Sequence, residues 1–417
     1  MRNIEYFRDK RVTIVGLAKS GASCAELLSS LGAMVSVTEQ KDNEEVRCHA
    51  AGLKAKKIRL ELGGHTPEFI RGQDLVVISP GVAGHALPVV WAEELKVPVI
   101  SEIEVGWFLC PGTVIAVTGS SGKTTVTTLI SRIFEAAGRK TFLLGNIGDP
   151  FCGQVEKVSA RDYVCLEVSS FQLERIRDFK PQVAVILNIG RNHLDRHKDM
   201  EEYIAAKKRI FMNQDKADFL VYNHDDEVLR LAVAGAEAGL VPFSAAGGLN
   251  PNEEALIGVG KVLGIDKKLI HEAFKNFTGL PHRMECVADL NGIRFINDSK
   301  ATTAESTIWA LNNIKAPVIL IAGGKDKGVD YGLIKQAAAG KVKLAVLIGE
   351  AASIISSALG DLLKVEYALD LSDAVNKAHA AASAGDCVLL SPMCSSFDMF
   401  SGYEERGECF KKAVASL

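Results

Sequence analysis

The stretch VIAVTGSSGKTTVTTLI, residues 114–130, decides how the chain is interpreted. A run of small and β-branched apolar residues ends at Val117, glycines follow at Gly119 and Gly122, and a helical pattern begins at Lys123. This order predicts a strand, a tight loop and a helix, which is the setting of a phosphate-binding loop. Glycines let backbone N–H groups point at phosphate oxygens, and the start of the helix adds a positive partial charge.

The residues of this loop have distinct expected roles. We expect Lys123 to reach the β- and γ-phosphates and the Thr124 hydroxyl to face Mg²⁺, a hard cation that prefers oxygen ligands. The strict pattern G-x-x-x-x-G-K-[ST] is not met, because Val117 stands five residues before Gly122. A glycine-serine turn that merely begins a helix is the alternative. The expected ATP contacts of the loop are Gly119, Ser120, Ser121, Gly122, Lys123, Thr124 and Thr125.

Composition narrows the class of protein. The chain has 417 residues, 47% hydrophobic and 24% charged, which is ordinary for a folded protein of two or three domains. The formal net charge of −3 and the lack of a lysine- or arginine-rich block argue against nucleic acid as a partner. We expect no signal peptide, no membrane insertion and a cytoplasmic location. Nine cysteines without a CxxC pair predict reduced thiols.

Short β-branched runs alternate with longer helical patterns, which is typical of an α/β fold with mostly parallel sheets. Three groups of strands can be distinguished. The first, a Rossmann-like unit, has strands at 12–15, 34–37, 75–78 and near 97–100. The second has them at 113–117, 163–167, 183–187 and 219–221. The third has them at 294–296, 318–321, 344–348 and 387–390.

The first strand ends in a second loop that begins a helix, formed by Gly16, Leu17, Ala18, Lys19, Ser20 and Gly21. Ala18 stands where a dinucleotide-binding loop needs its second glycine, which lets the backbone approach the pyrophosphate. NAD is therefore disfavoured, while another nucleotide diphosphate remains open. Glu39, at the end of the second strand, is a candidate for a ribose hydroxyl; a solvated strand-end charge is its alternative.

Polar residues also follow two strands of the second group. Glu167 ends one strand beside the phosphate loop, where a Mg²⁺ ligand belongs. Residues 188–197 follow the next strand and include His193 and His197. Each histidine alone is more often structural than a ligand. Because open α/β sheets bind ligands outside the carboxyl ends of their strands, the density of polar side chains favours a site.

Together these motifs resemble the Mur ligases of peptidoglycan synthesis along nearly the whole chain. The resemblance rests on segments with specific order and spacing: 16–21, 79–81, 118–125, 145–148, 167–173, 188–196, 206–207, 280–283, 297–302 and 390–407. Segments 79–81 and 298–302 favour the D-glutamate-adding branch over its siblings.

The resemblance implies three domains: 1–107, Rossmann-like, for the UDP substrate; 108–281, a phosphate-loop ATPase domain; and 282–417, Rossmann-like, which closes over ATP and binds the incoming amino acid. It implies that ATP phosphorylates the alanyl carboxylate of UDP-N-acetylmuramoyl-L-alanine and that the amine of D-glutamate attacks the acyl phosphate. A monomer is expected.

The resemblance also assigns residues. Catalysis is implied for Lys123, His193, Lys207 and Lys300. Two Mg²⁺ sites are implied at Thr124, Glu167, His193 and Lys207, the last as a carbamate. The ATP site adds Asn252, Arg283 and Asp298, and the UDP-substrate site comprises 16–21, Glu39, Asn146, Ser169 and His193. The D-glutamate site comprises Lys300, Thr302, Lys327, Ser396 and Tyr403. Considered alone, Lys207 belongs to a basic helix face.

The chain departs from the family pattern in one region. The segment after Phe243 is shorter, and the usual His-Asn pair is not visible, although Asn252 fits the asparagine near adenine. Tyr403 replaces an expected phenylalanine. Two alternatives are a sibling amide ligase, such as folylpolyglutamate synthetase, and a nucleotide-binding regulatory module without catalysis. Intact Lys123, Glu167, His193, Lys207 and Lys300 argue against the second.

Overall fold

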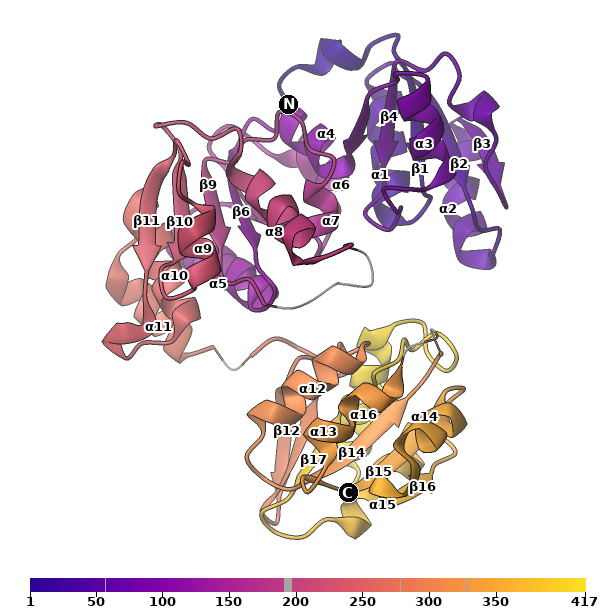
Figure 1. The fold of residues 1–417 in the computed structure, drawn as a ribbon, viewed down its shortest axis with the longest axis vertical. Coiled ribbons are helices and arrows are strands. Elements are labelled where there is room, and N and C mark those ends of the chain that lie inside the picture. The colour runs from indigo at the N-terminus through magenta and orange to yellow at the C-terminus, as the bar shows by residue number, and fades with distance from the viewer. Residues whose placement is uncertain (57, 191–196, 278, 327, 329) are drawn as a thin grey trace. The chain divides into compact units, whose positions relative to one another are not determined.

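A computed structural model describes residues 1–56, 58–190, 197–277, 279–326, 328 and 330–417. The chain forms two compact units, Met1–Asn276 and Phe277–Leu417 (Figure 1). The first unit contains two parallel sheets, and the second contains one mixed sheet. The structure is therefore α/β with three sheet-centred domains, as the sequence predicts.

The first sheet has five parallel strands in the order β3-β2-β1-β4-β5. They are β1 (Arg11–Val15), β2 (Met34–Glu39), β3 (Arg59–Leu62), β4 (Leu75–Ile78) and β5 (Val99–Ser101). Its helices are α1 (Lys19–Ser30), α2 (Glu44–Ala55) and α3 (Leu87–Glu94). Helix α4 (Glu102–Leu109) leads into the second sheet.

The second sheet has six parallel strands in the order β11-β10-β9-β6-β8-β7. They are β6 (Thr113–Thr118), β7 (Thr141–Gly145), β8 (Tyr163–Glu167), β9 (Val183–Ile186), β10 (Phe219–Asn223) and β11 (Gly239–Phe243). Its helices are α5 (Lys123–Ala136), α6 (Phe151–Gln154), α7 (Ser170–Leu173), α8 (Met200–Lys208), α9 (Glu227–Ala232), α10 (Pro251–Leu263) and α11 (Lys267–Lys275).

The second unit is built on a six-stranded sheet in the order β12-β13-β17-β14-β15-β16. Among the described strands of this sheet, β12 pairs with β13 in antiparallel fashion and the other pairings are parallel. The strands are β12 (Glu285–Leu290), β13 (Ile293–Asn297), β14 (Val318–Gly323), β15 (Val342–Ile348), β16 (Val365–Tyr367) and β17 (Cys387–Leu390). The helices are α12 (Ala304–Asn313), α13 (Lys335–Ala338), α14 (Ala352–Leu359), α15 (Leu371–Ala381) and α16 (Tyr403–Ala415).

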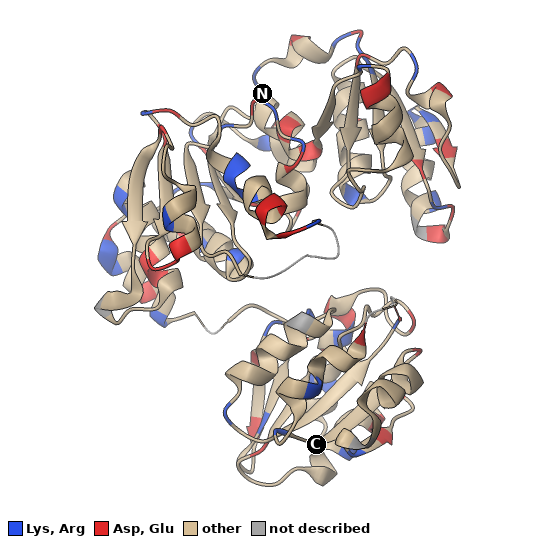
Figure 2. Cartoon of the chain, in the orientation of Figure 1, with Lys and Arg blue, Asp and Glu red and all other residues tan. Residues whose placement is uncertain are grey.

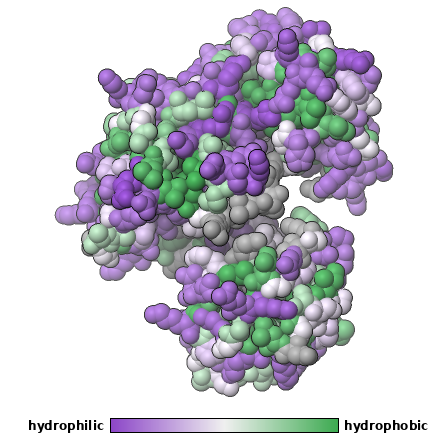
Figure 3. All heavy atoms as spheres, in the orientation of Figure 1, coloured by the Kyte–Doolittle hydropathy of each residue, from purple (hydrophilic) through white to green (hydrophobic). Residues whose placement is uncertain are grey.

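The surface carries both signs of charge. Figure 2 shows acidic and basic residues interspersed over both units rather than gathered by sign. In the face drawn in Figure 3, polar residues cover most of the surface and hydrophobic residues form small groups. None of the helices in the described ranges is both long and apolar enough to span a membrane.

Helix α6 joins the first two sheets, because it packs against both α1 and α4. Its N-terminus is held by Glu102, whose Oε1 accepts a hydrogen bond of 2.7 Å from the Cys152 backbone N–H. Glu102 is 2% exposed. Burial raises the pKa of this carboxyl from 4.5 to about 7, while backbone N–H groups at the start of α6 act against the shift.

Close backbone packing shapes the first loop. A Cβ at Gly21, in the first turn of α1, would lie 1.9 Å from the carbonyl oxygen of Gly16 and 2.7 Å from Ser79 Oγ. Only glycine fits there without moving backbone atoms. By contrast, a Cβ at Gly81 would meet nothing within 4 Å.

We predict that Gly21→Ala lowers the free energy of unfolding by about 2 kcal/mol, because the new methyl group collides with backbone. Gly81→Ala is the matched control and should change it by less than ~0.5 kcal/mol. Urea unfolding of both variants measures the difference. Equal urea midpoints for the two variants would contradict the close packing of Gly21 against Gly16.

The buried Glu102 predicts a pH dependence of stability. Its carboxyl binds a proton more tightly in the folded chain than in the unfolded chain, so its contribution to stability falls as pH rises from 4.5 to about 7. Glu102→Gln stays neutral at every pH. We expect the variant to gain about 3 kcal/mol relative to the native chain between pH 4.5 and 8.

Urea unfolding across this pH range provides the measurement. Glu94→Gln, which changes an exposed carboxylate of α3, should show a much smaller pH-dependent difference from the native chain. A pH-independent difference for Glu102→Gln would show that Glu102 keeps an ordinary proton affinity in the folded protein.

Candidate functional site

The phosphate loop lies between β6 and α5, as the sequence predicts. Gly122 is the N-cap of α5 with φ 79°, in the left-handed region that favours glycine. The Lys123 side chain turns back over the loop, and its Nζ donates to the carbonyl oxygens of Gly119 at 2.9 Å and Ser120 at 3.3 Å. Thr124 is buried in the first turn of α5.

The side-chain amide of Asn188, which follows β9, holds the backbone of the phosphate loop in place. Its Oδ1 accepts hydrogen bonds from the backbone N–H groups of Ser120 at 3.0 Å and Ser121 at 2.9 Å. The Ser120 hydroxyl lies 2.9 Å from the hydroxyl of Tyr203, a fully buried residue of α8. Residues from two neighbouring segments therefore hold the loop in shape.

Lys207 lies under the loop rather than on a solvated helix face. Its side chain is 1% exposed, and its Nζ donates to Gly119 O at 3.0 Å and to Thr118 Oγ1 at 3.3 Å. Burial and the nearby Lys123 cation lower the pKa of this amine well below its ordinary value, while Glu167 acts in the opposite direction. The basic-face interpretation of Lys207 is wrong.

Glu167 ends β8 next to the loop and is 1% exposed. Its Oε1 accepts a hydrogen bond of 2.6 Å from Asn146 Nδ2. Its Oε2 is buried without a hydrogen-bond partner among the described residues. A buried carboxylate oxygen without a donor is costly unless a cation completes it. With the Thr124 hydroxyl, this oxygen provides the type of ligand that Mg²⁺ prefers.

The short segment after β11 leads directly to α10. Residues 244–250 connect the two elements, and the Asn250 side chain caps the helix by accepting from the Asn252 N–H at 2.9 Å. The Asn252 side chain lies at the phosphate loop, because a Cβ on Gly122 would be 2.9 Å from Asn252 Oδ1. The shortened connection thus leaves Asn252 beside the loop.

The loop at 16–21 is closed by Glu39. The Glu39 carboxylate accepts hydrogen bonds from the backbone N–H of Leu17 at 2.6 Å and of Lys41 at 2.9 Å. Glu39 is thus half-buried and bonded to the backbone, and its role at a ribose hydroxyl stays a prediction. Lys19 pairs with Asp149 at 2.9 Å, in the connection that carries Asn146. The Lys19–Asp149 ion pair links the first loop to the connection that follows β7.

Ser169 caps α7 and forms a capping box with Gln172. His197 is buried, lies 2.9 Å from the Ser170 hydroxyl and stacks on Phe171, which is the structural role expected for a single histidine. The expected site residue His193 lies outside the described residues, so its predicted role stays a prediction.

The second unit gathers a separate group of the predicted residues. Asp298 follows β13 and accepts from the Met284 N–H at 3.2 Å and the Ser391 hydroxyl at 3.1 Å. Burial raises the pKa of its carboxyl to about 6, and the nearby Arg283 cation opposes the shift. Arg283 and Asp298 are therefore electrostatic neighbours, as a shared site requires.

Lys300 and Tyr403 also meet, since Lys300 Nζ lies 5.6 Å from the centre of the Tyr403 ring. Thr302 stands two residues after Lys300 in a tight turn, and its N–H donates to the Lys300 carbonyl oxygen at 2.9 Å. Ser396 is buried in the segment after β17. Lys327 lies outside the described residues, and its expected role stays a prediction.

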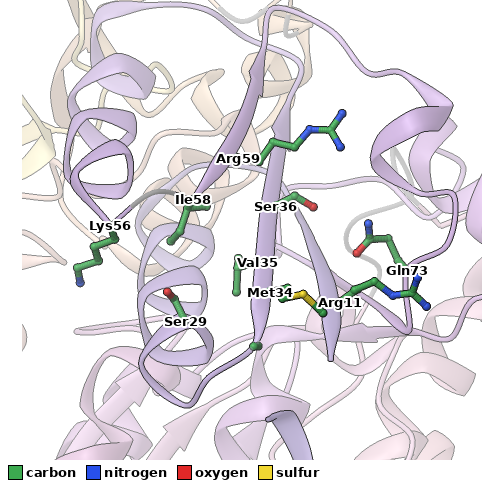
Figure 4. A pocket seen from close by; sticks show the side chains of 10 residues that line it. Arg11, Ser29, Met34, Val35, Ser36, Lys56, Ile58, Arg59 and Gln73 are labelled. Carbon is green, nitrogen blue, oxygen red and sulfur yellow. The ribbon is translucent and has the colours of Figure 1, made fainter. Parts of the chain in front are cut away.

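A cavity of about 380 Å³ lies away from all of these groups (Figure 4). Its lining includes Arg11, Met34 and Arg59, which are the first residues of β1, β2 and β3. The cavity is thus at the amino ends of these strands, whereas the predicted site residues follow carboxyl ends. It does not belong to the candidate site.

Sequence reasoning assigned no role to three residues that shape these groups: Asn188, Tyr203 and Arg406. Asn188 stood within a recognised segment directly after a strand, which was the available signal. Arg406 also lies in a recognised segment, 390–407, but its contact with Ser299 is distant in sequence, as is the contact of Tyr203 with Ser120.

Three family models match successive parts of the chain. Residues 10–101 match the "Mur ligase MurD-like, N-terminal domain", residues 117–255 the "Mur ligase middle domain", and residues 282–394 the "Mur ligase, glutamate ligase domain". Each model covers one of the three sheets.

Relatives match along the whole length. The UDP-N-acetylmuramoylalanine–D-glutamate ligase of Geotalea uraniireducens (strain Rf4) is 41% identical over 447 aligned positions, covering 98% of both chains. That of Chloroherpeton thalassium (strain ATCC 35110 / GB-78) is 39% identical and covers 99% of both. Since both alignments are longer than the 417 residues of this chain, these relatives carry insertions that it lacks.

Solved structures agree in fold. The UDP-N-acetylmuramate-alanine ligase MurC from Thermotoga maritima has a TM-score of 0.59 at 17% identity, covering 98% of this chain and 99% of its own. MurF from the same organism, solved in complex with ADP, has a TM-score of 0.58 at 15% identity, covering 100% and 97%. On the full-length identity and the three domain matches, the chain belongs to the Mur ligase family.

Proposed function

We propose that this chain is an ATP-dependent ligase that joins D-glutamate to UDP-N-acetylmuramoyl-L-alanine in peptidoglycan precursor synthesis. The observation that carries the proposal is the full-length identity of 41% to a ligase of that name. The phosphate loop, with Lys123, Asn188 and the buried Lys207 around it, supports the ATP-dependent part. A cytoplasmic location and a monomeric state accompany this function as proposals.

The reaction joins anions, so cations must bring them together. The alanyl carboxylate attacks the γ-phosphorus of ATP, the bond to ADP breaks, and an acyl phosphate forms. Lys123, at the start of α5, neutralises charge on the transferring phosphoryl group. Backbone N–H groups of the loop bind the phosphate oxygens, and the amide of Asn188 keeps the loop in the required shape.

Mg²⁺ fits the donors at this place. The buried Glu167 Oε2 and the Thr124 hydroxyl would hold one ion, and His193 with a carbamylated Lys207 would hold a second. When bound, Mg²⁺ supplies positive charge to the phosphate oxygens. Asn146 orients Glu167 by donating to its other oxygen at 2.6 Å.

Lys207 is suited to carbamylation by its surroundings. Its amine is buried beside two oxygen acceptors and a second lysine, where a positive charge is unfavourable. The amine adds to the carbon of CO₂ and loses a proton, which leaves a carbamate anion. The buried cation thereby becomes an oxygen ligand of opposite charge.

The second unit serves the incoming amino acid. We assign D-glutamate to Lys300, Thr302, Lys327, Ser396 and Tyr403, since two lysines complement a dicarboxylate. The amine of D-glutamate attacks the acyl carbon, and phosphate leaves as the amide forms. We assign Arg283, Asp298 and Asn252 to ATP binding. Residues 16–21, Glu39 and Ser169 serve the UDP substrate.

The assignment to D-glutamate predicts a strict amino-acid requirement. Phosphate release should need ATP, Mg²⁺, UDP-N-acetylmuramoyl-L-alanine and D-glutamate together, as measured by a coupled phosphate assay. Lys123→Ala should abolish release and serves as the control for contaminating ATPases. Turnover with L-lysine or meso-diaminopimelate in place of D-glutamate would instead identify a sibling ligase.

The carbamate predicts a distinct spectroscopic signal. With ¹³C-enriched bicarbonate, the native chain should show a carbamate carbon resonance by NMR, which Lys207→Arg should lack. Lys207→Arg should also slow phosphate release by ~100-fold or more, because it removes the carbamate oxygens that would hold the second Mg²⁺, whose charge the transferring phosphoryl group needs.

The exposed neighbour Lys208 is the matched control. Lys208→Arg should keep both the resonance and the rate. Native turnover by Lys207→Arg would refute the role of a carbamate at this position.

A further inference from the structure

Among the residues that the structure describes, the bulkiest fully buried side chain is a cation. Arg406, in α16, is 1% exposed. Its guanidinium donates four hydrogen bonds: Nε to Ser299 Oγ at 3.0 Å, Nη2 to Ser299 O at 2.8 Å and Cys394 O at 3.1 Å, and Nη1 to Ser395 O at 3.3 Å. The oxygens belong to three backbone carbonyls and one hydroxyl.

The hydrogen-bond acceptors belong to the segments after two paired strands, and a third neighbouring segment packs against the guanidinium. Ser299 follows β13, and Cys394 and Ser395 follow β17, which pairs with β13. Gly324 follows β14, on the other side of β17. A Cβ at Gly324 would lie 3.1 Å from Arg406 Nη1 and 2.3 Å from Ser395 O, so the guanidinium packs against this segment as well.

The same segments carry the amino-acid residues of the proposed function. Lys300 follows Ser299 in the chain, and Ser396 follows Ser395. The Ser299 hydroxyl, which accepts from Arg406, donates to the Tyr403 carbonyl at 2.8 Å. The hydrogen-bond partners of Arg406 are therefore chain neighbours of two predicted contacts of the amino acid, and one of them bonds to the backbone of a third.

We infer that Arg406 is a positioning residue that sets the spacing of the loops binding the incoming amino acid, without touching that amino acid itself. The inference rests on the proposed function. Arginine suits this role because its planar fork presents five N–H donors in fixed directions. Burial lowers the pKa of Arg406 to about 10, which still leaves it protonated near neutral pH.

Arg406→Lys keeps the positive charge but removes the planar fork, so it tests whether the fork sets the spacing of these loops. An ammonium group has three donors on one nitrogen, so it cannot reach oxygens spread over the segments after β13 and β17. Ser299→Ala is a milder second variant, because it removes one acceptor of the fork and leaves the side chain of Arg406 in place. Phe410→Leu, in the same helix, changes a residue of the buried core.

The measurement is the KM for each of the three substrates, at a temperature where circular dichroism shows every variant folded. We expect Arg406→Lys to raise the KM for D-glutamate by roughly tenfold, the cost of a lost charged hydrogen bond, and Ser299→Ala to raise it less. The KM for UDP-N-acetylmuramoyl-L-alanine should change by less than about twofold. Phe410→Leu should leave all three values near the native ones.

Unchanged KM values in both Arg406→Lys and Ser299→Ala would overturn the inference, and so would a rise shared by all three substrates. If Arg406→Lys does not fold, Ser299→Ala decides the question by the same criterion. Failure of the proposed function has a different signature: the native chain would release phosphate with another amino acid. The KM for that amino acid would then test Arg406.

Discussion

The parallel pairing of β6 between β8 and β9 is the constraint on which the candidate site depends. The register places Val117 opposite Glu167 and Thr118 opposite Ile186. Because parallel strands end at the same edge, the phosphate loop, the carboxylate of Glu167 and the amide of Asn188 emerge together. Side chains that are distant in sequence thus become neighbours through backbone pairing, before any of their own contacts form.

The strand pattern explains how much of the fold the sequence predicts. Buried strands such as β4 and β9 are continuous apolar runs, and their predicted limits agree with the structure to within one residue. The five missed strands, β3, β7, β11, β12 and β16, are all at sheet edges. An edge strand is partly exposed and mixes polar with apolar residues, as in Arg59–Leu62, so its apolar signal is weak.

In the candidate site, too, some parts are predictable from the sequence and others are not. The phosphate loop is local in sequence, and glycine spacing predicts its strand, turn and helix. Lys207 cannot be interpreted locally, because it stands in a basic run at the end of its helix, whereas its amine is buried against the phosphate loop, which is distant in sequence. The family resemblance singled out Lys207. Its burial against the phosphate loop is what distinguishes it from an ordinary surface lysine. Tyr203 escaped prediction because its hydroxyl acts on Ser120, a residue far along the chain.

Two buried basic side chains in this protein, Arg406 and Lys207, have surroundings with opposite effects on their charge. Arg406 is surrounded by carbonyl oxygens that satisfy its fork, so the pKa falls only to about 10 and the charge persists. Lys207 has two acceptors and a second cation, Lys123, nearby, so burial and this cation hold its pKa well below the ordinary value of a lysine. A side chain that stays protonated and has donors in fixed directions, as Arg406 does, is suited to holding loops together. An amine that readily loses its proton suits covalent change, which is the chemistry proposed for Lys207.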